Sequence, residues 1–483
     1  MMSDEYFDVI VAGAGLGGLQ CARLLGAAGA RVLLVDRKAS LDESVHTTGI
    51  FVRRTLEDFP LPADCLGPAV RAVTLYSPAR RPLRLESKFD EFRVGRMGKL
   101  YLRFLSDCER AGVSWSPATR YVNGEETTDG ETIVRLETKG RVRRVKTQLL
   151  VGADGAQSRV ARDLKLDANC EWIVGVEEVY AGVPLEGEPR FHCFLDPHIA
   201  PGYIAWVVHD GAEAHVGIGG YAARFEPLRA LEKFRASLGG LFDLSRAQLI
   251  ERRGGRIPVG GVLRRIANAR GLLVGDAAGA VSPLTAGGLD PTLRLSHLAA
   301  RVTGDYLKSS DAASLRPYAG DLFRARFSSR LLMRRLFTAV REPALLELSC
   351  AALRLPLLRG LAWHVFFGRG SFPDVEALVR DASAAQPHVA PEILSVQTLP
   401  VGVALQQAIQ MPVDPNIEAA GLDPAAVGTI IQIPPRRTFQ RGALSLQWQA
   451  EDRNSDAMEY AVYYRALNES VFHLLKELSL IHI

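Results

Sequence analysis

The residues of this sequence that are best placed to do chemistry lie first in a glycine turn near the N-terminus. Residues 13–18 read G-A-G-L-G-G, after the apolar run 7–12 and before a helical stretch of small residues. In such a turn Gly13 makes the bend, Gly15 lets the backbone approach a pyrophosphate, and Gly18 packs helix against strand. The N–H groups that open the helix then face the anion. The segment predicts a βαβ dinucleotide-binding unit; the alternative is a glycine-tolerant loop.

An acidic residue ends the apolar run that follows this helical stretch. Residues 31–36 read R-V-L-L-V-D, and Asp36 stands where such a unit needs a carboxylate to bind a ribose hydroxyl. Arg37, directly after it, is a further candidate for contact with the dinucleotide. The strand context and Asp36 together favour the dinucleotide over the bare loop.

Two more glycine turns occur farther along the chain. Residues 152–155, G-A-D-G, and residues 275–279, G-D-A-A-G, each follow an apolar run that predicts a buried strand. Asp154, Gly155 and Asp276 would then stand at strand ends, where a short carboxylate can accept hydrogen bonds from ligand hydroxyls. Aspartates beside glycine also stabilise turns by themselves, which is the alternative for both.

With these three turns the sequence resembles the para-hydroxybenzoate hydroxylase-like flavoprotein superfamily, whose members carry the motifs in this order. The resemblance covers roughly residues 5–370. It implies that the dinucleotide is FAD and that Asp276 contacts the ribityl chain. It also implies that Asp154 and Gly155 support FAD binding and that Arg96 lies near the flavin's phosphate or ribose. Arg96 as a surface residue at a helix start is the alternative.

Within the superfamily the sequence is most similar to the geranylgeranyl reductase family. Residues 281–289, V-S-P-L-T-A-G-G-L, are similar to that family's P-L-T-x-x-G-I run before a helix. Gly287 and Gly288 would bring backbone N–H groups to the pyrimidine edge of the flavin, which favours the negative charge of the reduced ring.

A second segment similar to this family carries two aromatic residues. Residues 201–206, P-G-Y-I-A-W, are close to the family's G-Y-x-W-x-F-P strand, and Tyr203 and Trp206 are the candidate substrate contacts. They are three residues apart instead of two, so they would share a strand face only across a bulge. The alternative is an aromatic pair that packs the core.

The resemblance also draws attention to one histidine. In the superfamily the loop at 45–50, here V-H-T-T-G-I, borders the isoalloxazine, so His46 is a candidate proton donor or gate. Reductases of the family often carry a cysteine in this loop, which this chain lacks. A solvated loop histidine is the alternative.

The composition is that of an ordinary folded protein. The chain has 483 residues, 47% hydrophobic and 23% charged, with a formal net charge of only +4, too even to predict nucleic-acid binding. Six cysteines without a C-x-x-C pair favour reduced thiols and a cytoplasmic protein. We find neither a signal peptide nor a membrane-spanning run. The histidines between 192 and 215 lack metal-ligand spacing, so we expect no metal site.

The patterns divide the chain into four parts. Alternating stretches between about 172 and 221 predict an antiparallel sheet that faces the substrate. The fold class is α/β: an FAD-binding Rossmann-type domain with a parallel sheet, an antiparallel β substrate domain, a helical cap and a small all-β tail. The expected boundaries are 1–75, 93–170 and 262–310 for the FAD-binding domain, 76–92 and 171–261 for the substrate domain, 311–375 for the cap and 385–483 for the tail.

The two C-terminal parts carry expectations of their own. Residues 316–369 hold ten arginines among apolar residues, which predicts either peripheral contact with an anionic membrane or simply a solvated basic face. Segments 443–448 and 460–464 resemble strands of a fibronectin type III-like β-sandwich. The ending 478–483, L-S-L-I-H-I, matches a reading frame of a sequencing adapter, so we expect a truncated tail.

These observations predict an FAD-dependent oxidoreductase, similar to geranylgeranyl reductases, that reduces C=C bonds of an isoprenoid or other apolar substrate. NAD(P)H or another reduced carrier would supply the electrons. An aromatic or polyketide monooxygenase of the same superfamily is the first alternative. A non-catalytic flavin-binding or interaction protein is the second.

Overall fold

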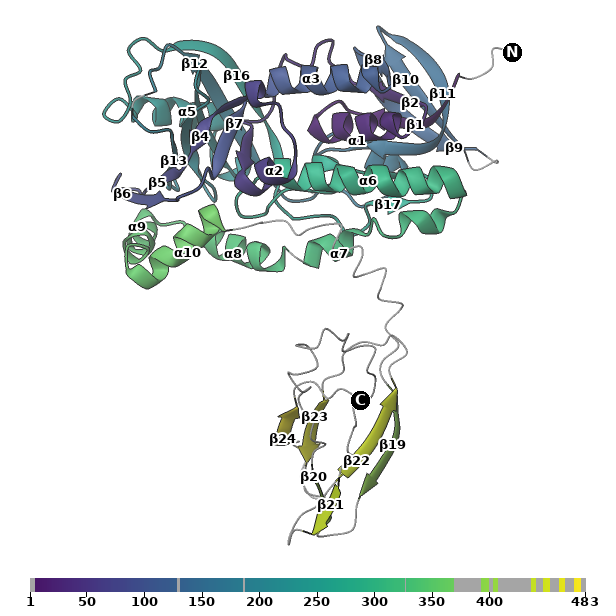
Figure 1. Cartoon of the computed structure of the whole chain (residues 1–483). Coiled ribbons are helices and arrows are strands. Elements are labelled where there is room, and N and C mark those ends of the chain that lie inside the picture. The colour runs from purple at the N-terminus through teal and green to yellow at the C-terminus, as the bar shows by residue number, and fades with distance from the viewer. Residues whose placement is uncertain are drawn as a thin grey trace, which may run out of the picture. The chain divides into compact units, whose positions relative to one another are not determined.

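The computed structural model of the chain describes residues 5–127, 131–185, 187–325 and 327–368, and the backbone of six strands beyond residue 391. The chain divides into two compact units, Met1–Arg380 and Asp381–Ile483. The first unit is drawn in purple to green in Figure 1, and it contains all the residues singled out above as site candidates.

An eight-stranded sheet carries the three glycine turns. Its order is β17-β18-β11-β1-β2-β8, with β10 beside β11 and β9 beside β10. Strands β18, β11, β1, β2 and β8 run parallel, whereas β9, β10 and β17 pair antiparallel, so the sheet expected to be parallel is mixed. The bounds are β1 Glu5–Ala12, β2 Val32–Val35, β8 Ser114–Ser116, β9 Thr119–Glu126, β10 Thr132–Thr138, β11 Arg141–Gly152, β17 Ala267–Asn268 and β18 Gly271–Leu273.

The register of the parallel strands brings the turns to one edge. Ala12, the last residue of β1, pairs with Val35 on one side and Gly152 on the other. Gly152 in turn pairs with Leu273 of β18. The carboxyl ends of four strands therefore lie in one row, which is where ligands bind in open α/β sheets.

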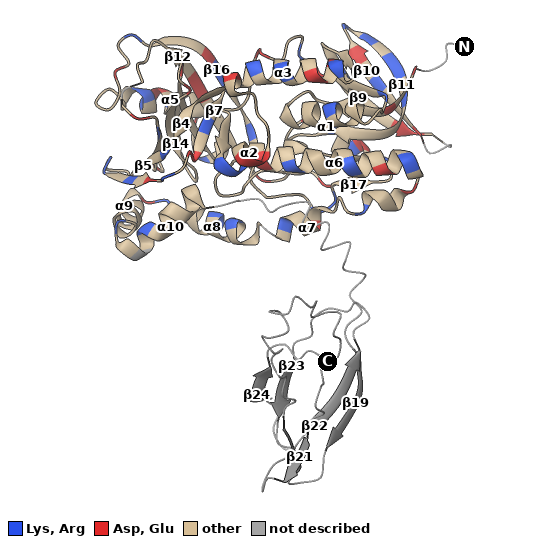
Figure 2. Ribbon diagram, in the orientation of Figure 1, with Lys and Arg blue, Asp and Glu red and all other residues tan. Residues whose placement is uncertain are grey.

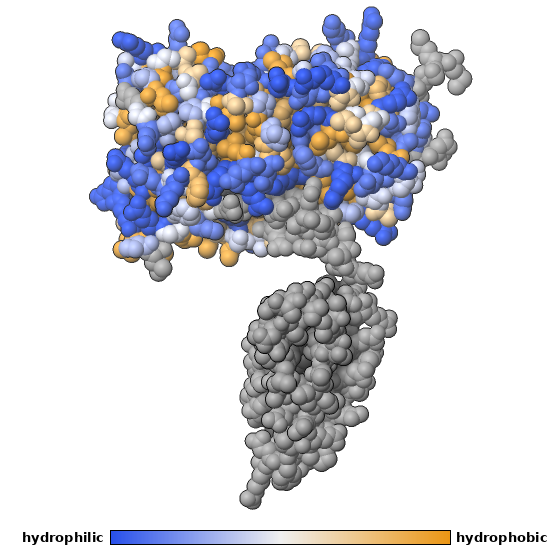
Figure 3. Space-filling view, viewed as in Figure 1, coloured by the Kyte–Doolittle hydropathy of each residue, from blue (hydrophilic) through white to orange (hydrophobic). Residues whose placement is uncertain are grey.

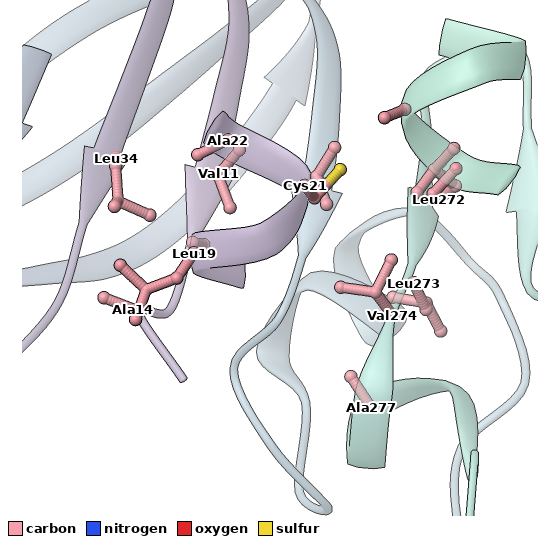
Figure 4. Packing of buried hydrophobic residues seen from close by; sticks show 14 of the residues in the cluster. Val11, Ala14, Leu19, Cys21, Ala22, Leu34, Leu272, Leu273, Val274 and Ala277 are labelled. Carbon is pink, nitrogen blue, oxygen red and sulfur yellow. The ribbon is translucent and has the colours of Figure 1, made fainter. Parts of the chain in front are cut away.

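Three helices pack beside the first glycine turn. Helix α1 contacts both α3 and α6. Side chains from β1, α1, β2 and β18, among them Val11, Leu19, Leu34 and Leu272, form the core seen in Figure 4. The bounds are α1 Leu16–Ala27, α3 Met97–Arg110 and α6 Leu289–Ser309.

A second sheet of seven strands forms the other half of the unit. Its order is β16-β12-β15-β14-β13-β5-β6, and every neighbouring pair is antiparallel except β13 with β5. The strand pair β5–β6 starts at residue 72, four residues before the expected boundary at 76. The bounds are β5 Ala72–Tyr76, β6 Pro82–Glu86, β12 Trp172–Ala181, β13 Arg190–Phe194, β14 Ala205–His209, β15 Ala214–Gly220 and β16 Gln248–Pro258.

Short elements join the two sheets. A three-stranded sheet has the order β3-β7-β4, and helix α5 packs against β15 and β12. The bounds are β3 Ile50–Val52, β4 Leu66–Val70, β7 Phe92–Gly95, α2 Arg53–Asp58, α4 Arg159–Asp163, α5 Pro227–Ala236, and the 3-10 turns η1 Ala63–Cys65, η2 Ala222–Arg224, η3 Gly275–Ala278 and η4 Ala312–Leu315.

Four helices follow η4 and lie along one side of the unit in Figure 1. Helices α9 and α10 begin with Pro343 and Pro356, as proline suits the first helical position. Within the described parts of the chain, no helix has both the length and the apolar character needed to cross a bilayer. The bounds are α7 Gly320–Ala325, α8 Ser328–Ala339, α9 Pro343–Ala352 and α10 Pro356–Phe367.

The second unit is described only as three antiparallel strand pairs. These are β19–β22, β20–β21 and β23–β24. The expected strands at 443–448 and 460–464 fall at β22 and β23, and the sandwich remains a prediction. The last residues, 479–483, on which the expected truncation rests, lie outside the described part. The bounds are β19 Glu392–Thr398, β20 Val403–Gln406, β21 Arg436–Phe439, β22 Leu446–Glu451, β23 Tyr460–Tyr464 and β24 His473–Leu478.

Candidate functional site

One large cavity of about 1220 Å³ connects the glycine turns with the helical cap. Its wall includes the first glycine turn, the loop at 46–50, the middle of the seven-stranded sheet, the loop at 284–288 and the inner faces of α8 and α10. A cavity of this size has room for more than one small-molecule group. Every site residue expected from the sequence, apart from Arg96, lies along this wall.

The glycines of the first turn have different roles. Gly13 has φ +108°, and a Cβ atom there would collide with the carbonyl of Ala153. A Cβ atom at Gly18 would collide with the carbonyl of Gly13. At Gly15 a Cβ atom would meet no atom within 4 Å, although the residue lines the cavity and caps α1. Packing therefore requires Gly13 and Gly18, whereas the open space at Gly15, beside a helix N-terminus, fits a pyrophosphate.

Asp36 holds this turn in place. Its Oδ2 accepts a hydrogen bond of 2.7 Å from the backbone N–H of Ala14, and its Oδ1 accepts one of 2.9 Å from that of Lys38. Asp36 and Arg37 both line the cavity. Each carboxylate oxygen retains a second lone pair, so Asp36 can still accept a ribose hydroxyl.

The second turn uses its aspartate to cap a helix. Asp154 Oδ2 accepts from the backbone N–H groups of Arg159 (2.7 Å) and Val160 (3.2 Å), at the start of α4. Its Oδ1 is buried and has no partner among the described residues. Burial raises the pKa of Asp154, although these hydrogen bonds oppose the effect. Gly155 has φ +85° and lines the cavity with Asp154. The turn-stabilising role is thus present, and one oxygen remains for a ligand.

The third turn presents a carboxylate with no partner. Asp276 lines the cavity, and its side chain makes no hydrogen bond within the described residues. Burial raises its pKa to about 6. A half-buried carboxylate that lines a cavity suits hydroxyl donors such as those of a ribityl chain. Gly288 lies close, because a Cβ atom there would be 3.6 Å from Asp276 Oδ1, and Gly287 lines the same wall.

Arg96 lies apart from these residues. It does not line the cavity, and its Nε is 3.9 Å from the Asp210 carboxylate, with the arginine side chain 42% exposed. The expectation that it lies beside the flavin phosphate has no support in this geometry. The residue lies between β7 and α3, and its guanidinium lies at the turn between β14 and β15, beside Asp210 and Gly211.

Tyr203 and Trp206 meet at the cavity wall. Their rings contact edge to face with centroids 6.5 Å apart. Tyr203 precedes strand β14 instead of lying in it, so the three-residue spacing places both rings on one side without a bulge. Gly217 and Gly219 on β15 make room, because a Cβ atom at either position would collide with Trp206 or Tyr203, respectively. The Tyr203 hydroxyl donates to the carbonyl of Thr285 at 2.6 Å, which ties this pair to the loop before α6.

A buried ionic network behind Trp206 was not predicted from the sequence. Glu177 of β12 lines the cavity and accepts hydrogen bonds from Trp206 Nε1 (2.9 Å), Arg253 Nε (2.8 Å) and the Thr48 hydroxyl. His215 Nδ1 lies 3.2 Å from Glu177 Oε1. The network therefore joins strands of the seven-stranded sheet to the loop at 46–50.

Charge compensation decides the ionisation of this network. Burial raises the pKa of Glu177, but His215, Arg253 and Thr48 outweigh it and hold the pKa at about 2. Burial lowers the pKa of His215, but the carboxylates of Asp210 and Glu177 outweigh it and raise the pKa to about 9. Because Asp210 Oδ2 is 3.8 Å from His215 Nε2, too far for a direct hydrogen bond, we attribute its effect to charge. The Arg253 guanidinium, whose Nη2 lies 2.9 Å from His215 Nδ1, opposes the charge on the imidazole, but the two carboxylates outweigh it. These pKa values leave both carboxylates and the imidazole charged at neutral pH.

A sequence signal for this network exists in hindsight. Residues 177 and 178 are adjacent glutamates within an otherwise apolar buried strand, and 252 and 253 are adjacent arginines in β16. The antiparallel register pairs Glu177 with Arg253 and Glu178 with Arg252. Two charges in a buried strand call for partners, but the partner strand could not be identified without that register.

His46 lines the cavity from the loop after β2. Partial burial lowers its pKa, and the positive charges of Lys38 and Arg37 lower it further. It is thus mostly neutral at neutral pH.

Elsewhere, Asp210, Glu213 and His215 bring possible metal-ligand atoms within 4.8 Å of one another, so the expected absence of a metal remains a prediction.

The comparisons with known proteins show the family of the chain and its distant relatives. The family model described as "FAD binding domain" matches residues 6–301. A digeranylgeranylglycerophospholipid reductase of Methanocaldococcus jannaschii is 26% identical over 315 residues, covering 64% of this chain and 79% of the relative. A further such reductase, of Methanothermobacter thermautotrophicus, is 29% identical over 327 residues, covering 64% and 80%, respectively.

The solved structures extend the likeness to the fold. A geranylgeranyl bacteriochlorophyll reductase-like protein of Thermoplasma acidophilum has a TM-score of 0.67 at 21% identity, covering 78% of this chain and all of that one. A p-nitrophenol 4-monooxygenase of Pseudomonas putida has a TM-score of 0.58 at 16% identity, covering 79% and 98%. The fold alone is thus shared by a reductase-like protein and a monooxygenase. By its family match, the chain belongs to the FAD binding domain family and is an FAD-dependent oxidoreductase, distantly related to the digeranylgeranylglycerophospholipid reductases.

Proposed function

We propose that this protein reduces carbon–carbon double bonds of an apolar, isoprenoid-like substrate. The observation that carries the proposal is the continuity of the cavity from the glycine turns to an apolar wall in the cap. That wall includes Met333 and Phe337 of α8 and Leu361, Val365 and Phe366 of α10. An unsaturated chain could lie there with one end beside the flavin site. The reductases related to this chain are named for geranylgeranyl lipids, which supports this choice of substrate.

FAD, when bound, supplies the hydride-transfer chemistry, and the chain would supply binding, orientation and protons. Asp36, the space at Gly15 and Asp276 are the residues proposed to hold it. Tyr203 and Trp206 would position the substrate chain, since both rings line the cavity and are fixed by hydrogen bonds to neighbouring groups.

The protons would come from the cavity wall. The imidazole of His46 is the proposed donor, because it lines the cavity. Its lowered pKa makes the charged imidazole the minor form at neutral pH, and that form releases its proton readily. Glu177 is ionised and already accepts several hydrogen bonds, so it acts in the proposal as a fixed charge beside the cavity. NAD(P)H or another reduced carrier is the proposed source of electrons.

The apolar helices also suit access from a membrane. Leu336 and Leu348 are 63% and 68% exposed on α8 and α9. Arginines lie on α8 and α10, where Figure 2 marks basic residues in blue, whereas α9 has none. Hydrophobic residues, in orange, appear along part of this edge of the unit in Figure 3. An exposed apolar face with arginines binds anionic lipid surfaces. We therefore propose that the cap is the side on which the protein meets a membrane.

Product analysis tests the reductase function. The purified full chain is incubated without oxygen with dithionite as electron source and geranylgeranyl phosphate as substrate, and the lipid is examined by mass spectrometry. We expect a gain of two hydrogen atoms for each reduced bond. An unchanged isoprenoid, together with oxygen-dependent hydroxylation of an aromatic compound, would assign the protein to the monooxygenases instead. If the bound FAD, after addition of dithionite or NADPH, passes electrons to none of the acceptors tested, the protein is a non-catalytic flavoprotein.

A further inference from the structure

Arg330, in the cap, lines the cavity and has no partner for its buried Nη1 among the described residues. Arg330, Met333 and Phe337 follow one another at i, i+3 and i+7 along α8, and all three line the cavity. Residues with this spacing lie on one face of a helix. Among the described cap residues that line the cavity, Arg330 is the one with a charge, because all others are apolar or glycine. A single cation thus stands in the apolar wall.

The Arg330 guanidinium is not satisfied by the protein. Its Nη1 is buried and has no hydrogen-bond partner among the described residues, and no charged neighbour contributes to the shift of its pKa. Burial accordingly lowers its pKa. A buried charged donor without a partner is costly and rare in folded proteins.

The neighbouring arginines of the cap, in contrast, have hydrogen-bond partners within the protein. Arg334, one turn farther along, is buried but donates to the carbonyls of Pro283 (3.0 Å) and Gly202 (3.5 Å) and to the Tyr221 hydroxyl (3.2 Å). Arg324 donates from Nη1 to two backbone carbonyls at 2.9 Å. The protein pairs these two arginines, whereas Arg330 lines the cavity without a partner among the described residues, which points to a ligand group as its partner.

We propose that Arg330 binds the anionic group of the substrate, so that the substrate is an acidic amphiphile: an unsaturated apolar chain that ends in a carboxylate or a phosphate ester. Both groups accept paired hydrogen bonds from a planar guanidinium. Other cations, Arg37 and Lys38, line the cavity beside the first glycine turn, where the FAD pyrophosphate would lie. The proposal rests on the proposed use of the cavity for an apolar chain, but it does not require reduction to occur.

Three ligands with the same chain test it on the full, FAD-loaded protein. Geranylgeranyl phosphate, geranylgeranoic acid and neutral geranylgeraniol are titrated by calorimetry into the wild type and into Arg330→Met. We expect the wild type to bind one or both acids about ten- to a hundredfold more tightly than the alcohol. Arg330→Met should lose this preference and retain the wild-type affinity for the alcohol. The acid that loses more affinity identifies the native head group.

Matched variants separate this role from structural effects. Arg335→Met makes the same change at an exposed arginine of the same helix that does not line this cavity, and it should keep the preference for acids. If Arg330→Met fails to bind FAD or to fold, Arg330→Gln and Arg330→Lys provide the same comparison, with lysine expected to keep part of the preference.

Three results would overturn the proposal. They are equal affinity of the wild type for acids and alcohol, an unchanged preference in Arg330→Met, or a shift of the flavin reduction potential in that variant without a change in head-group discrimination. If the preference behaves as expected but no ligand is reduced, the head-group site stands and the reductase function fails. If both proteins reduce geranylgeraniol and geranylgeranyl phosphate with equal efficiency, the reductase function stands and the head-group site fails.

Discussion

At the scale of single residues, the most constrained group is the buried carboxylate of Glu177. It is held by Arg253, His215, Trp206 and Thr48, from three strands and one loop. Removing one charge from a buried ion pair leaves the other without compensation, which is strongly unfavourable.

We expect Glu177→Gln to lower the free energy of unfolding by about 3 kcal/mol, because Arg253 loses the nearer of its two counter-charges and keeps only Glu251 at 3.7 Å. Denaturant unfolding measures this change. The matched control is Glu178→Gln, since Glu178 is equally buried but pairs with Arg252, whose side chain is 46% exposed. The control should lose clearly less stability. Equal losses of stability in the two variants would mean that the network around Glu177 stabilises the fold no more than the Glu178–Arg252 ion pair does.

The same network predicts a dependence of stability on pH. The pKa of His215 is raised from 6.5 to about 9, so its charged form stabilises the folded state. This contribution is fully present below pH 6.5 and is lost as the pH rises through 9. Glu177 and Asp210, with pKa values held at about 2, lose their contribution only in strong acid. Compared with His215→Gln, the wild type should lose more stability between neutral and alkaline pH, and parallel curves would contradict the assignment.

The glycines of the first turn allow ligand binding to be separated from packing. Gly15→Ala adds a methyl group where no protein atom lies within 4 Å, so we expect stability without FAD to change by less than about 0.5 kcal/mol, while FAD affinity falls at least about tenfold. Gly18→Ala collides with the Gly13 carbonyl and should destabilise the protein by roughly 2 kcal/mol. Thermal melts with and without added FAD make the comparison. Unchanged FAD affinity in Gly15→Ala would place the pyrophosphate elsewhere.

At the scale of elements, much of the site could be predicted because its signals are local. Each glycine turn follows its own strand in sequence, so the βαβ unit and the carboxyl-edge position of Asp154 and Asp276 could be predicted. Features that depend on pairing between distant segments could not. Glu177 finds Arg253 only through the register of β12 with β16, and the contact of Arg96 with Asp210 joins the end of β7 to the turn after β14.

The Tyr203 and Trp206 pair illustrates the same limit within one segment. Its spacing argued against a shared face, but strand β14 begins only at Ala205, so strand alternation does not decide where the Tyr203 ring points. The glycines of β15 that admit both rings were visible in the sequence, and their meaning required the antiparallel pairing of β14 with β15.

Helix α8 is attached to the rest of the unit through Arg334. Because Arg334→Met removes charged hydrogen bonds to the Pro283 carbonyl and the Tyr221 hydroxyl, we expect it to lower the free energy of unfolding by about 2 kcal/mol. We also expect a weaker affinity for geranylgeranyl phosphate, since α8 forms part of the cavity wall. Arg335→Met, on the exposed side, is the control. If the two variants unfold at the same denaturant concentration, Arg334 is not the anchor of this helix.

At the scale of the whole molecule, the exposed leucines of the cap predict membrane binding. The double variant Leu336→Asp/Leu348→Asp should reduce the fraction of protein that sediments with vesicles of anionic phospholipid, since it adds negative charge to an apolar face. Leu228→Asp changes a leucine that is 53% exposed on α5 and should have no effect. Equal sedimentation of the wild type and both variants would exclude the cap as the contact surface.

The central claim is that one cavity holds FAD at the glycine turns and an unsaturated apolar chain beside it. Its most direct test is a single turnover: the flavin of the full chain is photoreduced without oxygen, geranylgeranyl phosphate is added, and the oxidised-flavin absorbance is followed. We predict that the absorbance returns in the absence of oxygen and that one double bond is lost for each flavin reoxidised. A flavin that stays reduced with the isoprenoid and is reoxidised only by oxygen would contradict the account.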